Sequence, residues 1–379
     1  MKKNRIPDYI VSYDKLVLVT YVVLLLTGVV IMLDIASIQT SLTYFFRHTA
    51  YAASSFIIMI VALYFFNLEK LRSLNLLFIL VVIALLLIVL ALGPEVNGAT
   101  RQLRLGPLSI QPSFLARLAL VFFLAGFLAR KQEQLRITEF QSLVKEFLPP
   151  ILVTVVIFGL IILERHLSTL IIGGCTLVGM FFYAGMRKRY VFLILALGLI
   201  LGSLVIMKGE GYRKERLKAF KTYSLFTKNR PAPSNDPGEY QVHESLTALT
   251  TGSWLGTGMG YGRAKHYFLP EANTDYVYTI IGEEFGFVGA IIILLLQALL
   301  FFRAFRIAEA QTNLYFKYLC AGLAFNIFLN TLVNTGVAIS ILPPTGNTLP
   351  FISYGGTALL TDSLSVGVIL NISAKRRSL

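Results

Sequence analysis

Long apolar runs, separated by short polar segments, make up most of the chain. The runs cover approximately residues 16–34, 48–66, 75–93, 113–129, 147–163, 170–185, 190–207, 276–302, 315–340 and 353–373. Each approaches the ~20 residues that a helix needs to cross the hydrocarbon core of a bilayer, although 147–163 and 170–185 are short. The pattern predicts an all-α, polytopic integral membrane protein with about ten transmembrane helices. An even number of crossings leaves both termini on the same side.

The composition agrees with a membrane protein. Of the 379 residues, 56% are hydrophobic and 14% are charged, and the mean hydropathy is +0.71. A soluble domain of this length does not carry so many unbroken apolar runs. The first run, from Leu16, is long enough to span, so it predicts a retained helix and not a cleaved signal peptide.

Cysteine and histidine give no sign of a metal centre. Cys175 and Cys320 lie far apart in apolar runs, so they form neither a disulfide framework nor a metal-binding pair. The four histidines show no metal-ligand spacing. The sequence therefore specifies no cofactor.

The formal net charge of +14 is a topology signal. Lysine and arginine crowd the segments on the side of the termini: Lys2, Lys3, Arg5, Lys15, Lys70, Arg72, Arg130, Lys131, Arg136, Lys145, Arg187, Lys188, Arg189, Arg303, Arg306, Lys317, Lys375, Arg376 and Arg377. The short segments on the other side carry Arg47, Arg101, Arg104, Arg117 and Arg165. Because short cytoplasmic loops are enriched in these residues, we expect both termini inside. This placement argues against a nucleic-acid partner.

One long connection, residues 208–275, is expected outside, between the seventh and eighth helices of a single transmembrane domain. Its start, KGEGYRKERLKAFKTYS, carries lysines at helical spacing and predicts a basic amphipathic segment at the membrane interface. Three prolines in 229–239 predict a loop, and 240–254 resumes a helical pattern. The glycines between 256 and 262 lack a dinucleotide fingerprint and predict a tight re-entrant turn.

Two outer segments near the middle of the chain are unusually polar. In NGATRQLRLGPLSIQPS (97–113), Ser113 after Pro112 could cap the fourth helix. Arg117, one turn inside that helix, either faces a polar cavity or extends to the outer headgroups. The turn ERHLST (164–169) holds three ionisable groups and is either a wet outer edge or part of a polar cavity.

The stretch GTGMGYGRAKHYFLPEANTDYVYTIIGEE, residues 256–284, is the strongest candidate for chemistry. Asp275 precedes the eighth helix at the mouth of the bundle, where an acid is either a helix cap or a catalytic base. Glu283 and Glu284 would lie ~12–14 Å deeper along the helix, too far to form an acid/base pair with Asp275.

A fourth segment, NTGVAISILPPTGNTLPFISYGG (334–356), is rich in proline and glycine and carries no charge. Loops of this kind between transmembrane helices often re-enter the bundle and line a cavity. The alternative is a plain surface turn.

These segments together resemble the SEDS family (shape, elongation, division and sporulation), which includes FtsW, RodA and their sporulation relatives. The resemblance covers about residues 28–377 and is carried by GATRQLRLGPLSIQPS (98–113), YRKERLKAF (212–220), LPEANTDYVYTIIGEEFGFVG (269–289), NTGV and LPPTGNTLPFISYGG (334–356). KHYFLPEANTDYVYTIIGEE and LPFISYGGTALL look more like the division branch, FtsW, than the elongation branch.

The resemblance implies ten transmembrane helices in the bacterial cytoplasmic membrane and a peptidoglycan glycosyltransferase for septal or lateral wall synthesis. The substrate would be lipid II, an undecaprenyl-diphosphate-linked disaccharide pentapeptide, polymerised at the outer face. The implied partners are a class B penicillin-binding transpeptidase and other divisome or elongasome membrane proteins. Asp275 matches the catalytic aspartate of the family by its place in LPEANTDY.

The chemistry is consistent with that role. A carboxylate can accept the proton of the acceptor 4-hydroxyl, and an α-linked donor giving a β-1,4 link implies inversion by single displacement. Arg101, Arg117, Arg213 and Arg216 are candidates to stabilise the leaving diphosphate. A divalent cation, Mg²⁺ or Mn²⁺, could assist, but no cluster specifies one. From the matching motifs, Gln111, Ser113, Glu271, Thr274, Ser353, Gly355 and Gly356 are further candidates for substrate binding.

The sequence departs from the family pattern at two places. Where the family has QPSE followed three residues later by lysine, this chain has Phe114 and Arg117. Where the family has QPDLGT, the ERHLST turn puts His166 in the usual place of an aspartate. We expect an active enzyme whose surrounding polar contacts are altered.

Two alternatives of other classes stay open. A lipid II flippase would place its key charges near the bilayer midplane, where Arg117, Asp362 and Ser365 are the polar candidates. A non-catalytic activator of a class B penicillin-binding protein is compatible with the loss of glutamate at 114. A polymerase instead needs an acid at the outer face, as Asp275 is.

Overall fold

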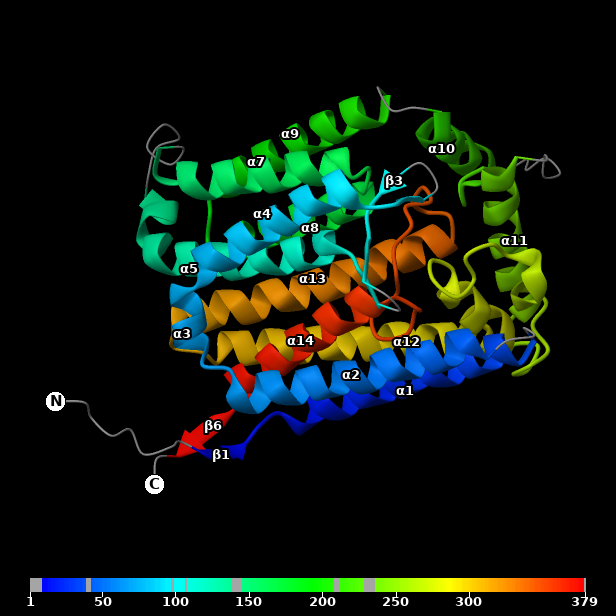
Figure 1. The fold of residues 1–379 in the computed structure, drawn as a ribbon, viewed down its shortest axis with the longest axis horizontal. Coiled ribbons are helices and arrows are strands. Elements are labelled where there is room, and N and C mark those ends of the chain that lie inside the picture. The colour runs from blue at the N-terminus through cyan, green and yellow to red at the C-terminus, as the bar shows by residue number, and fades with distance from the viewer. Residues whose placement is uncertain are drawn as a thin grey trace.

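The computed structural model describes residues 9–38, 42–96, 99–105, 108–137, 145–207, 211–227 and 236–377. Ten apolar helices run side by side along its length (Figure 1). They are α1 Lys15–Ile38, α2 Thr43–Phe65, α4 Asn75–Leu92, α5 Pro112–Ile137, α7 Leu148–Leu163, α8 Leu167–Tyr183, α9 Lys188–Met207, α12 Val277–Glu309, α13 Leu314–Ala338 and α14 Gly356–Ser373. The predicted all-α fold is confirmed.

The apolar helices have the length and surface of membrane spans. Seven helices in the described ranges, α1, α2, α4, α5, α12, α13 and α14, are long and apolar enough to cross a membrane, and α7 and α8 are shorter apolar helices. Leucines on α4, such as Leu76 and Leu80, are 60% and 55% exposed. Apolar side chains that point out of a bundle of apolar helices are those of a multi-pass membrane protein.

Several helix boundaries differ from the predicted runs: α2 begins at Thr43, before the run 48–66, and α5 and α12 continue to Ile137 and Glu309, past the ends of the runs 113–129 and 276–302. The last helix begins at Gly356, because 353–355 belong to the preceding loop, where the Ser353 hydroxyl donates to the Thr274 carbonyl at 2.6 Å instead of continuing the helix. A short helix that the pattern did not reveal, α3 Leu68–Ser73, precedes α4 and is capped by the Asn67 side chain. Hydropathy is insensitive to the side-chain hydrogen bond by which Asn67 caps α3.

The first and last described residues of the chain lie at the same end of the bundle. Strand β1, Tyr9–Ser12, pairs antiparallel with β6, Lys375–Arg377, just outside the first and last helices. Figure 1 shows this strand pair at one end of the bundle. The shared side of the termini is therefore confirmed, whereas its assignment to the cytoplasm stays a prediction.

The opposite end of the bundle carries the loops and small elements (Figure 1). They are the strand pairs β2 Glu95–Val96 with β3 Ala99–Thr100 and β4 Leu103–Leu105 with β5 Leu108–Ile110, then α10 Gly211–Tyr223, α11 Pro237–Gly252 and the π-helical turn η1 Ala264–Phe268. Within its described residues, the long 208–275 connection thus contains two α-helices and one π-helical turn.

Helix α10 packs on α11. Ala219 and Tyr223 of α10 are buried against Val242 of α11, and Lys218 forms an ion pair with Glu239 at 3.1 Å. The predicted amphipathic helix is therefore present, and its apolar face covers another protein element. The proline-rich segment predicted as a loop falls mostly in 228–235, outside the described residues.

Helix α12 is interrupted at Gly286, whose φ of 66° breaks the helical hydrogen-bond ladder. Residues 256–262, the glycine segment, pack against α12 where it is interrupted. The amides of Thr257 and Gly258 donate to the Glu283 and Glu284 carbonyls at 2.9 and 3.0 Å. In return the Phe287 amide donates to the Ser253 carbonyl at 2.8 Å. The tight turn predicted from the glycines is confirmed, and a side chain at Gly256 would collide with the Glu284 carbonyl.

Candidate active site

A cavity of about 1020 Å³ lies at the loop end of the bundle. Its lining comes from the first turn or turns of α2, α5, α11 and α14 and from the polar connections, including 94–111, 270–275 and 344–358. Among the side chains that the structure describes, the basic lining groups are Arg47, Arg101, Arg216 and His166, and the acidic ones are Glu271 and Asp275. The cavity therefore combines carboxylates with a surplus of permanently charged arginines.

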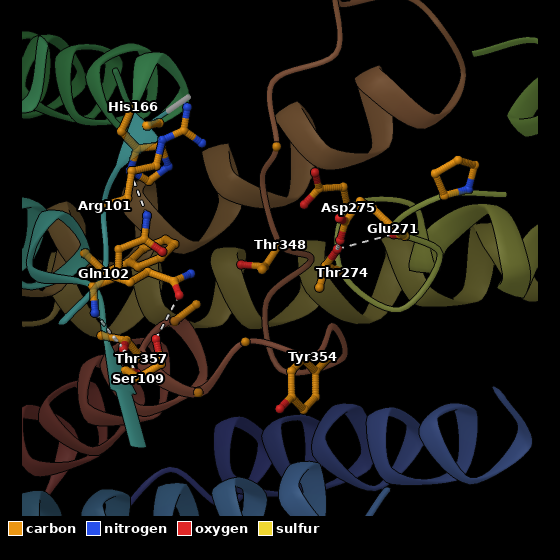
Figure 2. A pocket seen from close by; sticks show the side chains of 18 of the residues that line it. Arg101, Gln102, Ser109, His166, Glu271, Thr274, Asp275, Thr348, Tyr354 and Thr357 are labelled. Carbon is orange, nitrogen blue, oxygen red and sulfur yellow. Dashed lines mark hydrogen bonds between the residues drawn. The ribbon is translucent and has the colours of Figure 1, made fainter. Parts of the chain in front are cut away.

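Asp275 sits on a sharply turned loop before α12. Glu271 has a positive φ of 53°, and its carbonyl accepts the amides of Thr274, Asp275 and Tyr276 at 3.1–3.2 Å. A non-glycine residue in this left-handed region persists where its surroundings hold it there. The turn directs Asp275, Thr274 and Glu271 to one side of the cavity, as Figure 2 shows.

The predicted re-entrant loop 334–356 is hydrogen-bonded to the loop that carries Asp275. The Ser353 hydroxyl donates to the Thr274 carbonyl, and the Tyr354 amide donates to the Asn273 carbonyl at 2.9 Å. Thr348, Tyr354, Gly355 and other residues of this loop line the cavity. The re-entrant interpretation is thus confirmed over the surface-turn alternative.

Gly346 lies between the acid and a cation. A Cβ added to Gly346, whose φ is 69°, would lie 3.3 Å from Asp275 Oδ2 and 3.8 Å from Arg216 Nη1. Arg216 also donates to the Pro344 carbonyl at 3.1 Å, so α10 reaches over the loop to the site. Helix α10 therefore brings a guanidinium close to Asp275.

The environment of Asp275 raises the pKa of its carboxyl to about 6. Burial is the largest cause, and the nearby Glu271 carboxylate adds to it. The charges of Arg216 and Arg101 and a hydrogen bond from Thr274 act in the opposite direction. A carboxylate with this pKa is ionised at neutral pH and holds a proton more readily than an ordinary aspartate, which suits a general base.

Asp275 is not the helix cap that its position suggested. The residue flanking α12 is Tyr276, and no side-chain cap hydrogen bond is formed there. The cap interpretation of Asp275 is therefore wrong.

Arg101 and His166 lie across the cavity from Asp275 in Figure 2. Arg101 binds the Glu164 and Arg165 carbonyls at 3.4 and 2.6 Å, which ties the 94–111 connection to the turn between α7 and α8. Burial raises the pKa of the Glu164 carboxyl to about 8, although the charge of Arg101 and the nearby Ser113 hydroxyl oppose this. The ERHLST turn is thus part of the polar cavity wall.

His166 organises the cavity floor. Gln111 Nε2, Ser113 Oγ and Thr169 Oγ1 converge on its Nδ1 at 3.1, 2.9 and 2.9 Å. Burial, together with the charges of Arg101 and Arg117, lowers the pKa of His166 well below its usual value. The ring is therefore neutral at physiological pH.

Ser113 is not a helix cap. Helix α5 begins at Pro112, so Ser113 lies inside its first turn, and the side chain contacts His166 instead of the helix backbone. Proline lacks a backbone N–H, but the N–H at the first helical position has no partner within the helix in any case. Pro112 is therefore a favourable first residue, which explains why the helix begins one residue earlier than predicted.

Arg117 lies inside the bundle, beneath the cavity. It is 2% exposed, its Nη1 donates to Asn330 Oδ1 at 3.4 Å, and its guanidinium lies over the Phe114 ring at 5.0 Å. The charge of Asp362, itself buried, acts on it. The headgroup-anchor alternative is wrong, and Arg117 contacts the floor rather than lining the cavity.

The remaining candidates divide into lining and supporting residues. Gln111, Gly355 and Gly356 line the cavity together with Arg101, Arg216, Glu271 and Thr274. Ser353 is buried behind the wall and supports it. Arg213 belongs to α10, but its side chain lies outside the described residues.

The carboxylates of the site do not form a metal cage. Among the described residues, no three His, Cys, Asp or Glu side chains gather in a way that could hold an ion. Asp275 and Glu271 are the acids among the described lining residues, and a divalent cation usually takes six oxygen ligands. The residues therefore do not fit a dedicated metal site, and we derive no step through a metal.

Sequence reasoning missed two parts of this region. Arg47 and Tyr51 of α2 line the cavity, although the sequence of α2 predicts an ordinary span. Lys265 is fully buried between Asp34 and Glu284. The lysine's place ten residues before Asp275, in an otherwise polar loop, gave no signal of burial, because its partners come from α1 and α12.

The fold and the site together define a polytopic membrane protein with an acid and several arginines in a cavity at the loop end of its bundle. The chain belongs to the FtsW/RodA/SpoVE family, described as "Cell cycle protein", whose profile matches residues 11–378.

Named relatives cover most of the chain. It is 38% identical over 301 residues, 78% of this chain and 71% of the relative, to a probable peptidoglycan glycosyltransferase FtsW from Pseudoalteromonas translucida. A protein with the same designation from Geobacter sp. is 32% identical over 377 residues, 97% of this chain and 98% of the relative.

Solved structures share the fold. A chain from work on "Structural coordination of polymerization and crosslinking by a peptidoglycan synthase complex" superposes with a TM-score of 0.76 at 25% identity, covering 96% of this chain and 98% of that one. The rod shape determining protein RodA of Thermus thermophilus superposes with a TM-score of 0.68 at 23% identity, covering 96% and 97%, and supports the fold alone.

Proposed function

We propose that this protein is a peptidoglycan glycosyltransferase that polymerises lipid II at the outer face of the bacterial cytoplasmic membrane. The observation that carries the proposal is Asp275, on the wall of a 1020 Å³ cavity, with its carboxyl pKa raised to about 6 and with Arg216 and Arg101 acting on it. The designation of the FtsW relatives supports the same activity and favours septal synthesis during cell division.

The reaction follows from these groups. The Asp275 carboxylate accepts the proton as the O4–H bond of the acceptor sugar breaks, and the freed electron pair forms the O4–C1 bond to the donor sugar. The C1–O bond to the diphosphate breaks on the opposite side, which inverts the anomeric carbon from α to β. The electron pair of that bond stays on the diphosphate, which leaves with its lipid.

The arginines stabilise the leaving group. A diphosphate gains negative charge as the C1–O bond breaks, and guanidinium groups held in place lower the energy of that charge. Arg216 and Arg101 line the cavity and are fixed by backbone carbonyls, so they need little reorganisation. Arg117, being buried beneath the floor, acts on this region through its charge. A divalent cation bound by the diphosphate itself would add to the neutralisation.

The remaining proposals concern the orientation of the protein in the membrane and its protein partners. The termini and the 130–146 connection face the cytoplasm, and the cavity faces outward, where lipid II is presented. A class B penicillin-binding transpeptidase is the proposed partner, because the similar solved chain comes from a complex that couples polymerisation to crosslinking. Other membrane proteins of the division machinery would join this pair.

Lipid II transport is the competing function. It is favoured by the charged residues Arg117 and Asp362, which are buried inside the bundle, where a flippase would place its key charges. The cavity is lined by loop residues and first helical turns, which favours chemistry at the outer face. Labelled lipid II in proteoliposomes discriminates the two: a flippase moves the label across the bilayer without making glycan.

The deciding experiment incubates the purified protein and its partner with lipid II and resolves the products on a glycan gel. We expect long strands from the wild type and a ~10²–10⁴-fold lower rate from Asp275→Asn, the loss typical of removing a general base. Glu244→Gln, an acid of α11 that does not line the cavity, is the matched control. Strands made by Asp275→Asn at the wild-type rate would remove this acid from the mechanism.

A further inference from the structure

Lys265 is a lysine without exposed surface. Its side chain is 0% exposed, its Nζ lies 2.7 and 2.6 Å from the two Asp34 carboxylate oxygens, and it also pairs with Glu284. Asp34 belongs to α1, Glu284 to α12 and Lys265 to η1. Because lysine is almost never fully buried unless it is paired, this triad is a built feature of the fold.

Backbone amides donate hydrogen bonds to the carboxylate of Glu284, the second acid of the triad. Glu284 Oε1 accepts from the amides of Gly260 and Gly262 at 3.3 and 3.2 Å. Its neighbour Glu283 accepts from the amides of Arg263 and Ala264 at 2.8 and 3.0 Å. The two glutamates of α12 thus hold both the lysine and the backbone that leads to it.

The triad lies at the upstream end of the loop that carries Asp275. From Lys265 the chain closes η1 with a hydrogen bond from the Leu269 amide to the Ala264 carbonyl, and Leu269 is buried. The turn at Glu271 follows immediately. The downstream part of the same loop is held by Ser353 and Tyr354.

We propose that Lys265 is a positioning residue for Asp275: with Asp34 and Glu284 it forms an ionic latch that fixes the upstream end of the catalytic loop. A buried ion pair adds little net stability compared with apolar residues of similar size, but it defines one arrangement of the elements that it joins. Here it sets the loop against α1 and α12. The kinetic part of this proposal rests on the proposed glycosyltransferase function.

The test uses full-length protein purified with its partner. Lys265→Met removes the cation, Lys265→Arg keeps it, and Asp34→Ala removes the tie to α1 while leaving the Lys265–Glu284 pair. Lys317→Met is the matched control, because Lys317 pairs with Glu309 at 2.9 Å away from the cavity. The measurements are kcat and KM for lipid II polymerisation and hydrogen–deuterium exchange of residues 264–276.

We expect Lys265→Met to lower kcat by ~10²-fold with KM unchanged, since a displacement of about 1 Å at a reacting group costs that much. Asp34→Ala should lower kcat by a smaller factor, and Lys265→Arg should recover most of the rate. Exchange in 264–276 should quicken in Lys265→Met and Asp34→Ala, while α10 and α13 exchange as in the wild type. Lys317→Met should match the wild type in every measurement.

Wild-type kcat and wild-type exchange in Asp34→Ala would overturn the proposal, even if Lys265→Met fails to fold. Faster exchange over the whole bundle would also overturn it, because the triad would then serve general stability. If the wild type makes no glycan, the proposed function fails, whereas the exchange of 264–276 still decides whether the latch exists.

Discussion

Asn334 donates a hydrogen bond from its side-chain amide to the backbone carbonyl of Asp275 at 2.8 Å. The same nitrogen lies 2.5 Å from the Asn347 carbonyl, and Asn334 itself is buried on α13. One side chain of a membrane helix therefore holds the catalytic loop and the re-entrant loop together. The position of the acid is set by the bundle as well as by its own loop.

Replacing Asn334 tests that relationship. We expect Asn334→Ala to lower kcat by ~10–10²-fold, because Asp275 loses a backbone restraint and a misplacement of about 1 Å is enough for such a loss. The control is Asn371→Ala on α14, whose amide donates to the Ala62, Leu63 and Phe66 carbonyls near the ends of α2 and α14 opposite the cavity. That change should lower thermal stability while the folded fraction keeps its rate. Equal rates for the two variants would mean that Asn334 does not position the acid.

The pH dependence of polymerisation should report Asp275. A base must be ionised to accept a proton, and burial and Glu271 raise the pKa of this carboxyl to about 6. The value of kcat/KM should therefore be full above that pH and fall as the pH drops through about 6. A profile of initial rates from about pH 4.5 to about pH 8 covers both sides of that pKa and measures the fall. An acidic limb near the ordinary value for aspartate would contradict the assignment.

Two variants should move that limb in opposite directions. Glu271→Gln removes a like charge that raises the pKa of Asp275, so the limb should move to lower pH. Arg216→Ala removes an opposite charge that lowers it, so the limb should move to higher pH. Lys218→Ala, on the same helix but paired with Glu239, should leave the limb in place. Parallel shifts in both variants would show that loop distortion, and not charge, is responsible.

Much of the fold could be predicted from hydropathy, because a bilayer imposes a length on every apolar helix. All ten runs are helices. Short elements escaped the prediction, since α3 depends on an Asn67 cap and the pairing of β1 with β6 brings together the two ends of the chain. Contacts between distant segments leave no local pattern.

The site was predictable to the extent that its residues lie in polar loops. Asp275 and Arg101 were found because polar segments in a membrane protein are conspicuous, and Gln111 was found from the motifs that resemble the family. The roles of Ser113 and Arg117 were not, because both depend on which face of α5 meets its neighbours. Arg47 and Lys265 were missed because their partners are distant in sequence: Arg47 interacts with Tyr354 in the loop before α14, and Lys265 pairs with Asp34 of α1 and Glu284 of α12.

The orientation in the membrane can be tested by labelling. In a Cys175→Ser background, a membrane-impermeant maleimide should reach Thr247→Cys on α11 in intact cells and should not reach Glu133→Cys on α5. Both positions are exposed, and they belong to the opposite ends of the bundle. After permeabilisation both should react, which controls for reactivity. Labelling of Glu133→Cys alone in intact cells would reverse the topology.

The interruption of α12 at Gly286 leads to a prediction about stability. Gly286 has φ 66° and ψ −166°, a backbone conformation almost confined to glycine, and a Cβ there would collide with the backbone of Trp254 and Gly256. We expect Gly286→Ala to destabilise the protein by at least the ~1–3 kcal/mol of such strain. Gly159→Ala on α7 is the matched control, because a Cβ at Gly159 meets no atom within 4 Å and removing a helical glycine gains ~0.5–1 kcal/mol. Thermal unfolding midpoints in one detergent compare the two. A midpoint of Gly286→Ala at or above that of Gly159→Ala would mean that the glycine segment does not depend on this break in α12.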